Sequence, residues 1–339
     1  MTFAWGIVGI GNHPNLFMAP AIGNAKGSRL AAVCSRDQER AEEFAARHNA
    51  AAAYATYDQL LRDPNVNGVY VASPNFLHCE HVVKAAEAGK HVLCEKPMAL
   101  SVEDGERMVE AADRAGVTLS VGFHLRHHPA HQEMRRRITL GEAGKLVTVQ
   151  AMWSIGKRGL PIMEPREGLR GWWNDPELVG GGGLFGTGVH TIDLVRFILG
   201  DEVAEVFAFT DQGPEQPLDL VADVLLRLRG GATASVKASR IIPDSQNDFV
   251  VYGNSERLAA RDTASTALQG TLEVASESGF EITSYTKGDL FVSQVEDFVE
   301  AIDQKRPPLA SGVDGLRNLQ VHLGVYEAAR TGRAVVLPG

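Results

Sequence analysis

Two residues in the chain combine a reactive side chain with a position that suits contact with a ligand. Lys96 lies in the segment Glu95-Lys96-Pro97, directly after a short apolar run, and His190 follows a glycine-rich stretch. Burial lowers the pKa of a lysine below its usual ~10.4, and the unperturbed pKa of histidine is ~6.5. This pair suits proton removal from a hydroxyl group and stabilisation of the resulting alkoxide. The alternatives are a surface ion pair between Lys96 and Glu95, and a histidine that only caps a turn.

The glycine-rich stretch runs from Gly180 to Gly188 and is followed by an amphipathic run, His190 to Leu199, which Gly200 ends. This pattern predicts a helix with a glycine cap. Consecutive glycines let the backbone approach a neighbouring group closely. We expect His190 in the first helical turn, where backbone N–H groups lack partners and a histidine can face a ligand.

A second glycine-rich segment, Gly9-Ile10-Gly11-Asn12-His13, follows an apolar strand that we predict over residues 3–10. A helix is predicted directly after it, with Pro14 in its first turn. Backbone N–H groups and the helix dipole at such a turn can hold a pyrophosphate. The segment therefore predicts dinucleotide binding, although Pro14 stands where a third glycine is usual.

The end of the second predicted strand, residues 30–34, indicates which dinucleotide is bound. An acidic residue there holds the ribose 2′-hydroxyl of NAD. Here the position is Ser35, followed by Arg36 and, one helical turn later, Arg40. A hydroxyl and guanidinium groups suit a 2′-phosphate, so we expect NADP(H). Asp37 could still reach a ribose hydroxyl, so NAD(H) stays an alternative. A second alternative is that both arginines are solvated and Ser35 only caps a helix.

Strands and helices alternate over the first third of the chain, and this pattern predicts a doubly wound parallel sheet. The expected strands span residues 3–10, 30–34, 66–72, 91–94 and 117–123. After residue 123 the strands become longer and alternate in polarity, as in a mostly antiparallel sheet. We therefore predict an α/β chain with a dinucleotide-binding domain over 1–123 and an α+β domain over 124–339 that binds substrate and forms oligomer contacts.

Composition excludes several classes of protein. The 339 residues carry a formal net charge of −9, which argues against nucleic acid or an anionic membrane as the main partner. No apolar run reaches the ~20 residues of a membrane span. The apolar residues 3–10 lack a preceding basic region, since the first lysine is Lys26, and the three cysteines form no CxxC pair. We therefore expect a cytoplasmic protein without disulfides.

A cluster of histidines raises the possibility of a metal site. His127 and His131 have the i, i+4 spacing that chelates zinc on a helix, and His124 and His128 lie beside them. Glu133 is the one acidic residue near enough to complete the set. We therefore predict no metal, and expect His124 to line the cofactor and substrate site because it follows a strand end.

These motifs together resemble the Gfo/Idh/MocA family of oxidoreductases. The resemblance extends over nearly the whole chain. It is carried by the first glycine loop, Ser73-Pro74-Asn75 with His78, the segment from Ala88 to Pro97, the glycine-rich stretch with His190 and Asp193, and the segment from Ala328 to Arg333.

The resemblance implies a Rossmann domain followed by an open-faced sheet used in homodimer or homotetramer contacts. It also implies an NAD(P)-dependent oxidoreductase that acts on a hydroxyl or carbonyl group of a sugar, anhydro-sugar or cyclitol, with Lys96 and His190 at the reacting carbon. The expected cofactor contacts are Gly9, Gly11, Asn12, His13, Ser35, Arg36, Arg40, Ser73, Asn75, His78, Glu95, Lys96 and Trp172. The expected substrate contacts are His124, Arg126, Trp173, Thr187 and Asp193.

The chain departs from the family pattern where an aspartate usually lies four positions before the catalytic histidine. That position is Gly186, and Thr187 offers only a weaker hydrogen bond. Trp173 also replaces a common arginine. Two other functions therefore stay open: redox-neutral sugar chemistry with a retained cofactor, and a non-catalytic sensor.

Substrate specificity is expected to come from residues 154–175 and from the face of the second sheet. Four basic residues in this loop favour an acidic substrate, although a charged loop is more often only solvated. These residues are Lys157, Arg158, Arg166 and Arg170.

Overall fold

A computed structural model describes residues 2–158 and 166–339. The chain divides into two units. The N-terminal unit comprises the residues up to Gly122 together with Phe291–Leu319, and the C-terminal unit comprises Phe123–Leu290 and Gln320–Gly339. Among the described residues, no helix has the length and apolar character needed to cross a membrane.

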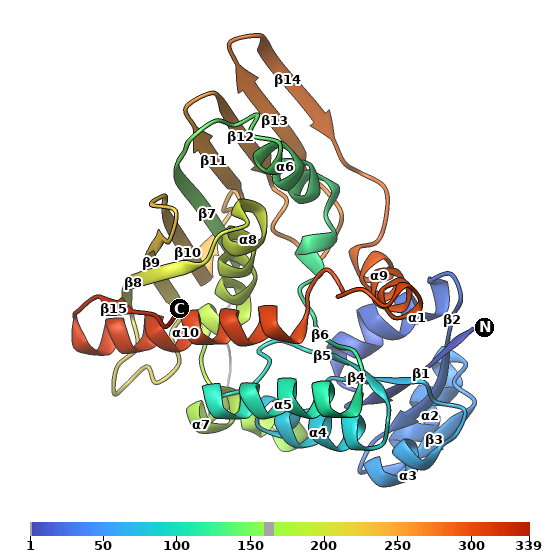
Figure 1. Ribbon diagram of the computed structural model, residues 1–339. Helices are drawn as coiled ribbons and strands as arrows, with labels where there is room; N and C mark the ends of the chain where they lie inside the picture. The colour runs from blue at the N-terminus through green and yellow to red at the C-terminus, as the bar shows by residue number, and fades with distance from the viewer. Residues whose placement is uncertain (1, 159–165) are drawn as a thin grey trace. The chain divides into compact units, whose positions relative to one another are not determined.

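The N-terminal unit contains a parallel sheet of six strands in the order β3-β2-β1-β4-β5-β6 (Figure 1). The strands are β1 (Phe3–Val8), β2 (Ser28–Cys34), β3 (Ala52–Tyr54), β4 (Gly68–Val71), β5 (His91–Cys94) and β6 (Leu119–Val121). The strand order reverses between β1 and β4, which is where doubly wound sheets bind ligands. The predicted doubly wound sheet is confirmed, but the short strand β3 was not predicted because its alanines are only half-buried.

Helices cover both faces of this sheet. Trp5 and Ile7 of β1 pack on the side of α1 (Ala19–Asn24) and α2 (Gln38–His48), while Gly6 faces Leu60 of α3 (Tyr57–Arg62). Helices α4 (His78–Glu87) and α5 (Val102–Ala115) lie side by side (Figure 1). Their N-termini follow β4 and β5 by short loops, so the polar loop residues lie at the carboxyl edge of the sheet.

The N-terminal unit also includes a segment that the sequence analysis assigned to the second domain. Helix α9 (Leu290–Gln304) follows all the strands of the second sheet except β15, yet its Phe291, Val295 and Phe298 belong to the core around Trp5. The ring centroids of Phe298 and Trp5 are 5.0 Å apart. The compact units therefore differ from the predicted domain 124–339: residues 291–319 belong to the first unit, and α9 completes its core.

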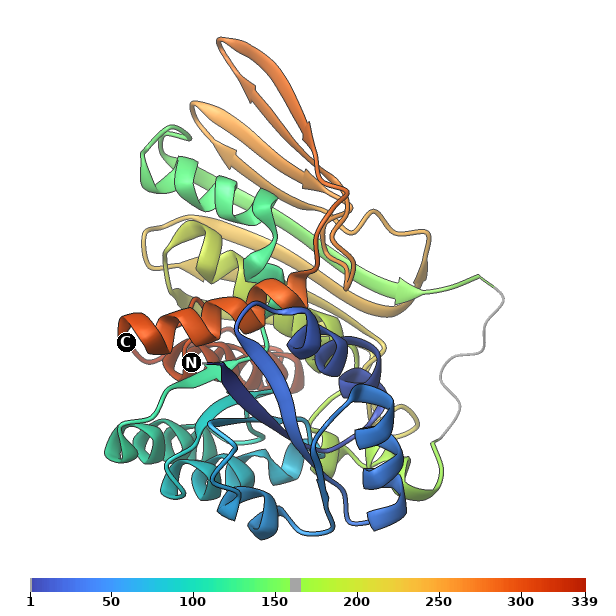
Figure 2. The same ribbon diagram turned by 90° about the vertical axis from the view of Figure 1, so that its right-hand side faces the viewer.

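The C-terminal unit is built on a nine-stranded sheet in the order β14-β13-β12-β11-β7-β10-β9-β8-β15. All neighbours are antiparallel except β7 and β10, which confirms the predicted mostly antiparallel sheet. The strands are β7 (Leu146–Gly156), β8 (Val203–Thr210), β9 (Val221–Leu228), β10 (Thr233–Pro243), β11 (Phe249–Gly253), β12 (Glu256–Arg261), β13 (Thr271–Ser276), β14 (Gly279–Ser284) and β15 (Val335–Val336). Strands β13 to β15 were not predicted; β13 and β14 form a hairpin at one edge (Figure 2).

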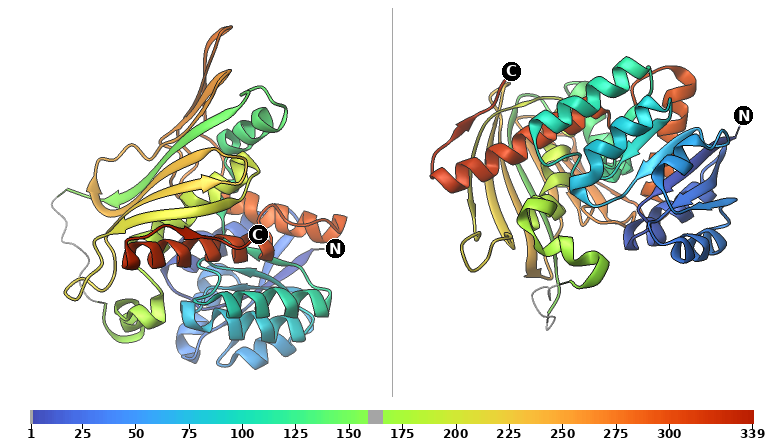
Figure 3. Two further views of the ribbon diagram at one scale, coloured as in Figure 1. Left: turned by 60° about the vertical axis from the view of Figure 1, so that its left-hand side comes forward. Right: turned by 90° about the horizontal axis from the view of Figure 1, so that it is seen from below.

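The two faces of this sheet differ in exposure. In β9, Val224 and Leu226 are buried, whereas Leu225 between them is 57% exposed. Helices α6 (Pro129–Thr139) and α8 (Val189–Leu199) lie together on the buried face (Figure 3). We call the opposite face, which carries Leu225 and the 69% exposed Phe209, the open face.

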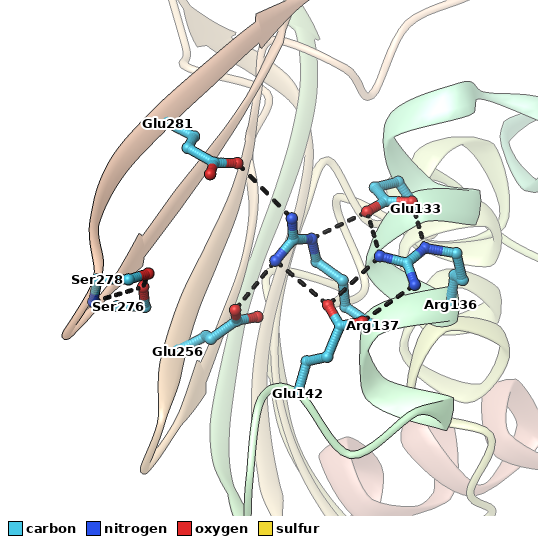
Figure 4. A network of polar contacts seen from close by, with 8 residues as sticks. All are labelled: Glu133, Arg136, Arg137, Glu142, Glu256, Ser276, Ser278 and Glu281. Carbon is cyan, nitrogen blue, oxygen red and sulfur yellow. Dashed lines mark hydrogen bonds and ion pairs between the residues drawn. The ribbon is translucent and has the colours of Figure 1, made fainter.

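An arginine links the sheet to helix α6, which the sequence analysis did not predict. Arg137 contacts Glu133 on its own helix at 2.9 Å, Glu142 after the helix at 3.3 Å and Glu256 of β12 at 3.0 Å (Figure 4). Glu281 of β14 lies 3.7 Å away. Since these partners form a network around a largely covered guanidinium, they stabilise the helix against the sheet more than an isolated surface pair would.

Candidate active site

The loop after β1 has the geometry of a phosphate-binding turn. Gly9 has φ of +87°, and a Cβ atom there would lie 2.3 Å from the carbonyl oxygen of Ala72, so only glycine fits. A Cβ atom on Gly11 would meet nothing within 4 Å, so its backbone faces open space. The helical turns begin at Asn12 and continue through the π-helical turn η1 (Pro14–Met18) into α1. The first N–H groups of this helix can therefore donate to an anion, and the loop fits a dinucleotide pyrophosphate.

The end of β2 leaves two guanidinium groups exposed. Asp37 is the N-cap of α2, because its Oδ1 accepts from the N–H of Arg40 at 3.2 Å. The Ser35 hydroxyl accepts from the N–H of Asp37 at 3.3 Å. Among the described residues, neither Arg36 nor Arg40 has a side-chain hydrogen bond or ion pair, so both can bind a phosphate. Asp37 is occupied as a cap, which weakens its case as a ribose ligand.

His78 connects two of the predicted cofactor-binding loops. Its ring nitrogens lie 2.9 Å from the carbonyl oxygens of Pro97 and Ser73, and its side chain is buried. Burial lowers the pKa of His78, while the two carbonyl oxygens act in the opposite direction. The Ser73 hydroxyl lies 2.9 Å from Nδ1 of His81, and Asn75 begins the following 3₁₀ turn, η2 (Asn75–Leu77). His78 therefore positions the loops after β4 and β5 with respect to each other.

Lys96 lies in a group of polar side chains at the end of β5. The peptide bond between Lys96 and Pro97 is cis. The N–H of Lys96 donates to Oε2 of Glu95 at 3.2 Å, and the hydroxyl of Tyr70 donates to Oε1 of the same carboxylate at 2.5 Å. Nδ1 of His13 lies 3.0 Å from the Tyr70 hydroxyl. Burial lowers the pKa of His13, Glu95 raises it and the nearby Lys96 ammonium lowers it.

The C-terminal unit corrects the expected position of His190. The sequence analysis placed this residue in the first turn of a helix, but the π-helical turn η5 (Leu184–Gly188) runs directly into α8. His190 therefore lies more than one turn inside a continuous helix, and the N–H groups at its level are hydrogen-bonded within the helix. Gly183 and Gly188 adopt the right-handed helical conformation, so the glycine-rich stretch continues the helix and does not form a tight turn before His190.

The true start of this helix is capped by Asp219, which the sequence analysis missed. The buried carboxylate accepts from the N–H groups of Gly182 and Leu184 at 2.8 and 2.7 Å, and from the hydroxyl of Tyr326 at 2.7 Å. A Cβ atom on Gly182 would lie 2.0 Å from the backbone oxygen of Asp219. The glycine-rich stretch thus serves a close approach between two backbone segments, as its composition predicts.

Aromatic rings surround His190. Its ring centroid lies 4.7 Å from that of His124, 5.0 Å from that of Trp153 and 6.3 Å from that of Phe123. Nε2 of His124 lies 3.3 Å from the carbonyl oxygen of Ser265. The structure therefore brings His190 and His124 together, as expected for a shared site, within a largely apolar wall.

Three predicted substrate contacts have partners within the protein. Arg126 donates to Asp193 through Nε at 2.8 Å and through Nη2 at 2.6 Å, and both side chains are buried. The hydroxyl of Thr187 donates to the carbonyl oxygen of Gly183 at 3.2 Å. Removal of either partner of the buried ion pair would leave an uncompensated charge, so the pair gives both residues a structural role. Contact of these three residues with substrate stays a prediction.

The histidine cluster is occupied by hydrogen bonds. His128 caps α6 by accepting from the N–H of Ala130, and its Nε2 lies 2.9 Å from the carbonyl oxygen of Gln269. The nitrogens of His131 lie 2.7 Å from the carbonyl oxygen of Leu125 and 2.9 Å from the hydroxyl of Thr263. Within the described part of the chain, no three His, Cys, Asp or Glu residues gather in a way that could hold a metal ion.

The predicted specificity loop is described only in part, because residues 159–165 lie outside the described residues. In the 3₁₀ segment η4 (Gly168–Asn174), the rings of Trp172 and Trp173 stack with centroids 4.5 Å apart. The guanidinium of Arg166 lies 4.2 Å from the ring centroid of Trp173. Arg158 forms an exposed ion pair with Asp244.

Three residues of these clusters were not singled out from the sequence: Tyr70, Asp219 and Tyr326. A tyrosine within an apolar strand needs a hydrogen-bond partner for its hydroxyl group. Tyr70 lies in such a strand, so the sequence could have indicated a polar partner for it. Asp219 directly precedes an alternating strand, but nothing in the sequence pairs it with glycines more than thirty positions earlier.

The comparisons with known proteins agree with this geometry. Residues 3–123 match the Gfo/Idh/MocA oxidoreductase family with an NAD-binding Rossmann fold, and residues 131–259 match a Gfo/Idh/MocA C-terminal domain. The 1,5-anhydro-D-fructose reductase of Ensifer adhaerens is 31% identical over 97% of this chain and 97% of its own length. D-xylose 1-dehydrogenase (NADP(+)) 2 of Haloferax volcanii is 29% identical over 98% and 99%. The crystal structure of aldose-aldose oxidoreductase from Caulobacter crescentus complexed with glycerol covers 99% of this chain and 100% of its own, with a TM-score of 0.90 and 27% identity.

His131 predicts a loss of stability in acid. Burial and the neighbouring His128 lower its pKa to about 3, so the folded chain holds this ring neutral. The unfolded chain takes up a proton near pH ~6.5, so the stabilisation is complete above that pH and is lost as the pH falls towards 3. Between pH 7 and 5 the free energy of unfolding should fall by about 2 kcal/mol through this residue alone.

Urea unfolding of wild type and His131→Asn at both pH values measures this contribution. The variant should be less stable at pH 7 and should show a smaller decrease towards pH 5. Parallel decreases in the two proteins would show that His131 does not carry the pH dependence.

Proposed function

Since the chain belongs to the Gfo/Idh/MocA family of NAD(P)-dependent oxidoreductases, as its motifs predict, we propose that it transfers a hydride between NADP(H) and a sugar, anhydro-sugar or cyclitol. The observation that carries this proposal is the position of Lys96. It follows β5 at the same edge of the parallel sheet as the glycine loop after β1 and the Ser35 segment after β2. A cation at this edge suits stabilisation of oxygen at the carbon that exchanges hydride.

The preference for NADP(H) is supported by the end of β2. Arg36 and Arg40 are exposed, and Asp37, which directly follows Arg36, is engaged as a helix cap. Guanidinium groups bind phosphate oxygens through paired hydrogen bonds, whereas a ribose hydroxyl calls for a carboxylate. One relative, the xylose dehydrogenase of Haloferax volcanii, is also named for NADP(+).

In the proposed mechanism Lys96 and His190 both act on the substrate oxygen. The nicotinamide accepts or supplies the hydride when it is bound. In the direction of oxidation, His190 takes the hydroxyl proton as the C–H bond breaks, and the Lys96 ammonium stabilises the negative charge that develops on oxygen. In reduction, the same oxygen receives the proton from His190.

Tyr70, Glu95 and His13 position Lys96 in this proposal. Glu95 accepts from both the Tyr70 hydroxyl and the Lys96 N–H, so one carboxylate fixes the backbone at the lysine. A Cβ atom on Gly122 would approach Oε1 of Glu95 to 2.8 Å, so the carboxylate also packs tightly against β6.

Substitution of Lys96 tests the catalytic assignment. Lys96→Met should lower kcat by on the order of 10²–10⁴-fold, because an electrostatic stabiliser of the alkoxide is lost. Lys84→Met, which removes an exposed lysine paired with Glu80 on α4, serves as the control and should leave kcat unchanged. Full activity of Lys96→Met would show that Lys96 is not catalytic.

Two other observations would favour the alternative functions. Nucleotide that co-purifies with the wild type and does not exchange would favour redox-neutral chemistry. The absence of any turnover in the wild type would favour a sensor.

Cofactor titration tests the phosphate argument. Quenching of tryptophan fluorescence should give a Kd for NADPH that is about tenfold or more below that for NADH, since one charge-assisted hydrogen bond contributes about 1.5 kcal/mol or more. Arg36→Ala should weaken NADPH binding selectively, whereas Arg62→Ala, at an exposed position of α3, should change neither constant. Equal affinity of the wild type for both nucleotides would contradict the preference.

The open face of the C-terminal sheet is the proposed contact of a homodimer or homotetramer. Phe207 and Phe209 of β8 have ring centroids 5.1 Å apart, and Phe207 pairs with the exposed Leu225 of β9. An exposed apolar patch on a sheet face is typical of protein–protein contacts.

Light scattering coupled to gel filtration checks this proposal. Leu225→Asp should convert the oligomer to a monomer, because the interface would bury an unpaired carboxylate. Leu140→Asp, at another strongly exposed leucine directly after α6, should leave the mass unchanged. A monomeric wild type, or a Leu225→Asp variant that keeps the wild-type mass, would rule out this surface.

A further inference from the structure

The absence of the usual aspartate at position 186 leaves a guanidinium group beside the helix that carries His190. A Cβ atom on Gly186 would lie 3.7 Å from Nε, 3.8 Å from Nη2 and 3.9 Å from Cζ of Arg240. These are ordinary van der Waals distances, so the guanidinium packs next to the bare backbone. Gly186 lies four positions before His190 in continuous helical structure, hence on the same side of the helix about one turn away.

Arg240 carries a charge that the described residues do not neutralise. Its Nε atom is buried and has no hydrogen-bond partner among them. Asp219, a nearby carboxylate, accepts hydrogen bonds from Gly182, Leu184 and Tyr326 and forms no ion pair with Arg240. Burial lowers the pKa of Arg240, while Asp219 and Tyr326 raise it. A buried guanidinium nitrogen without an acceptor is costly unless a ligand supplies one.

Two further arginines extend this positive region. Arg166 is held by Asn174, whose side chain accepts from the N–H of Arg166 at 2.9 Å and donates to its carbonyl oxygen at 2.7 Å. Its guanidinium lies over the ring of Trp173. Burial lowers the pKa of Arg166, and the positive charges of Arg240 and Arg170 lower it further. Repulsion of this kind is relieved by an anion placed among them.

We infer that the substrate carries an anionic group, a carboxylate or a phosphate ester, which Arg240 binds beside Gly186 with Arg166 and Arg170 near it. The planar guanidinium donates two parallel hydrogen bonds to either group. In this arrangement the substrate supplies the negative charge that other family members place on the protein as an aspartate. The inference rests on the proposed function, because the ligand in question is the substrate of the hydride transfer.

Matched substrate pairs test the inference. Initial rates with NADP⁺ are measured for D-glucose, D-glucuronate and D-glucose 6-phosphate, and for D-galactose and D-galacturonate, with calorimetric binding of each sugar as a second readout. We expect at least one anionic sugar to exceed its neutral counterpart about tenfold or more in kcat/KM or in affinity. The uronate and phosphate arms distinguish the two sources of charge.

Gly186→Asp is the most informative variant. Gly186 does not have the positive φ that would strain another residue, and its Cβ position is open, so the fold should tolerate the change. The new carboxylate would pair with Arg240 and occupy the place of the substrate anion. The ratio of anionic to neutral kcat/KM should fall about tenfold, and Arg240→Met should lower the same ratio.

Arg107→Met is the matched control, because it removes an exposed arginine that already has a partner in Asp104 and lies outside the loop with the candidate anion-binding residues. The control should leave the ratio unchanged. Hydride transfer to or from neutral sugars without any anionic preference, or a ratio unaffected in Gly186→Asp, would overturn the inference and leave the proposed function intact. Failure of the chain to bind either dinucleotide would instead overturn the proposed function itself.

Discussion

The buried carboxylate of Asp219 fixes the part of the C-terminal unit on which the candidate chemistry depends. It satisfies the N–H groups of Gly182 and Leu184 at the start of the helix, and it accepts the hydroxyl of Tyr326 from helix α10 (Gly312–Thr331). A helix start without such partners leaves donors unpaired at a cost of about 1–3 kcal/mol each when buried. The start of this helix in turn fixes the direction in which the helix face with Gly186 and His190 points.

A second carboxylate, Glu95, has the same role in the N-terminal unit. It connects Tyr70 of β4, the backbone of Lys96 and the neighbourhood of His13, and so ties three strand ends to one group. In both units a buried acid therefore orders the backbone next to a basic candidate residue. The difference is that Glu95 lies beside Lys96 in sequence, whereas Asp219 is distant from His190.

This difference explains how much the sequence predicts. The parallel sheet, its glycine loop and the position of Lys96 follow from local patterns, because apolar runs, turn residues and strand ends are read within a few positions. The start of the helix before His190 could not be predicted, since it depends on Asp219, a contact across more than thirty residues. The half-buried strand β3 and the strands β13 to β15 were missed for a related reason, because their stability comes from pairing rather than from their own composition.

The assignment of α9 to the N-terminal unit has a consequence for the order of synthesis. Trp5 emerges from the ribosome almost first, but Phe291 and Phe298, which share its core, follow nearly three hundred residues later. The first unit therefore cannot complete its core while the second is being made, and apolar surface stays uncovered through most of translation. The second unit is likewise incomplete until Tyr326 is synthesised, because the Tyr326 hydroxyl donates a hydrogen bond to Asp219. The last segment of each unit is therefore synthesised only after most of the other unit.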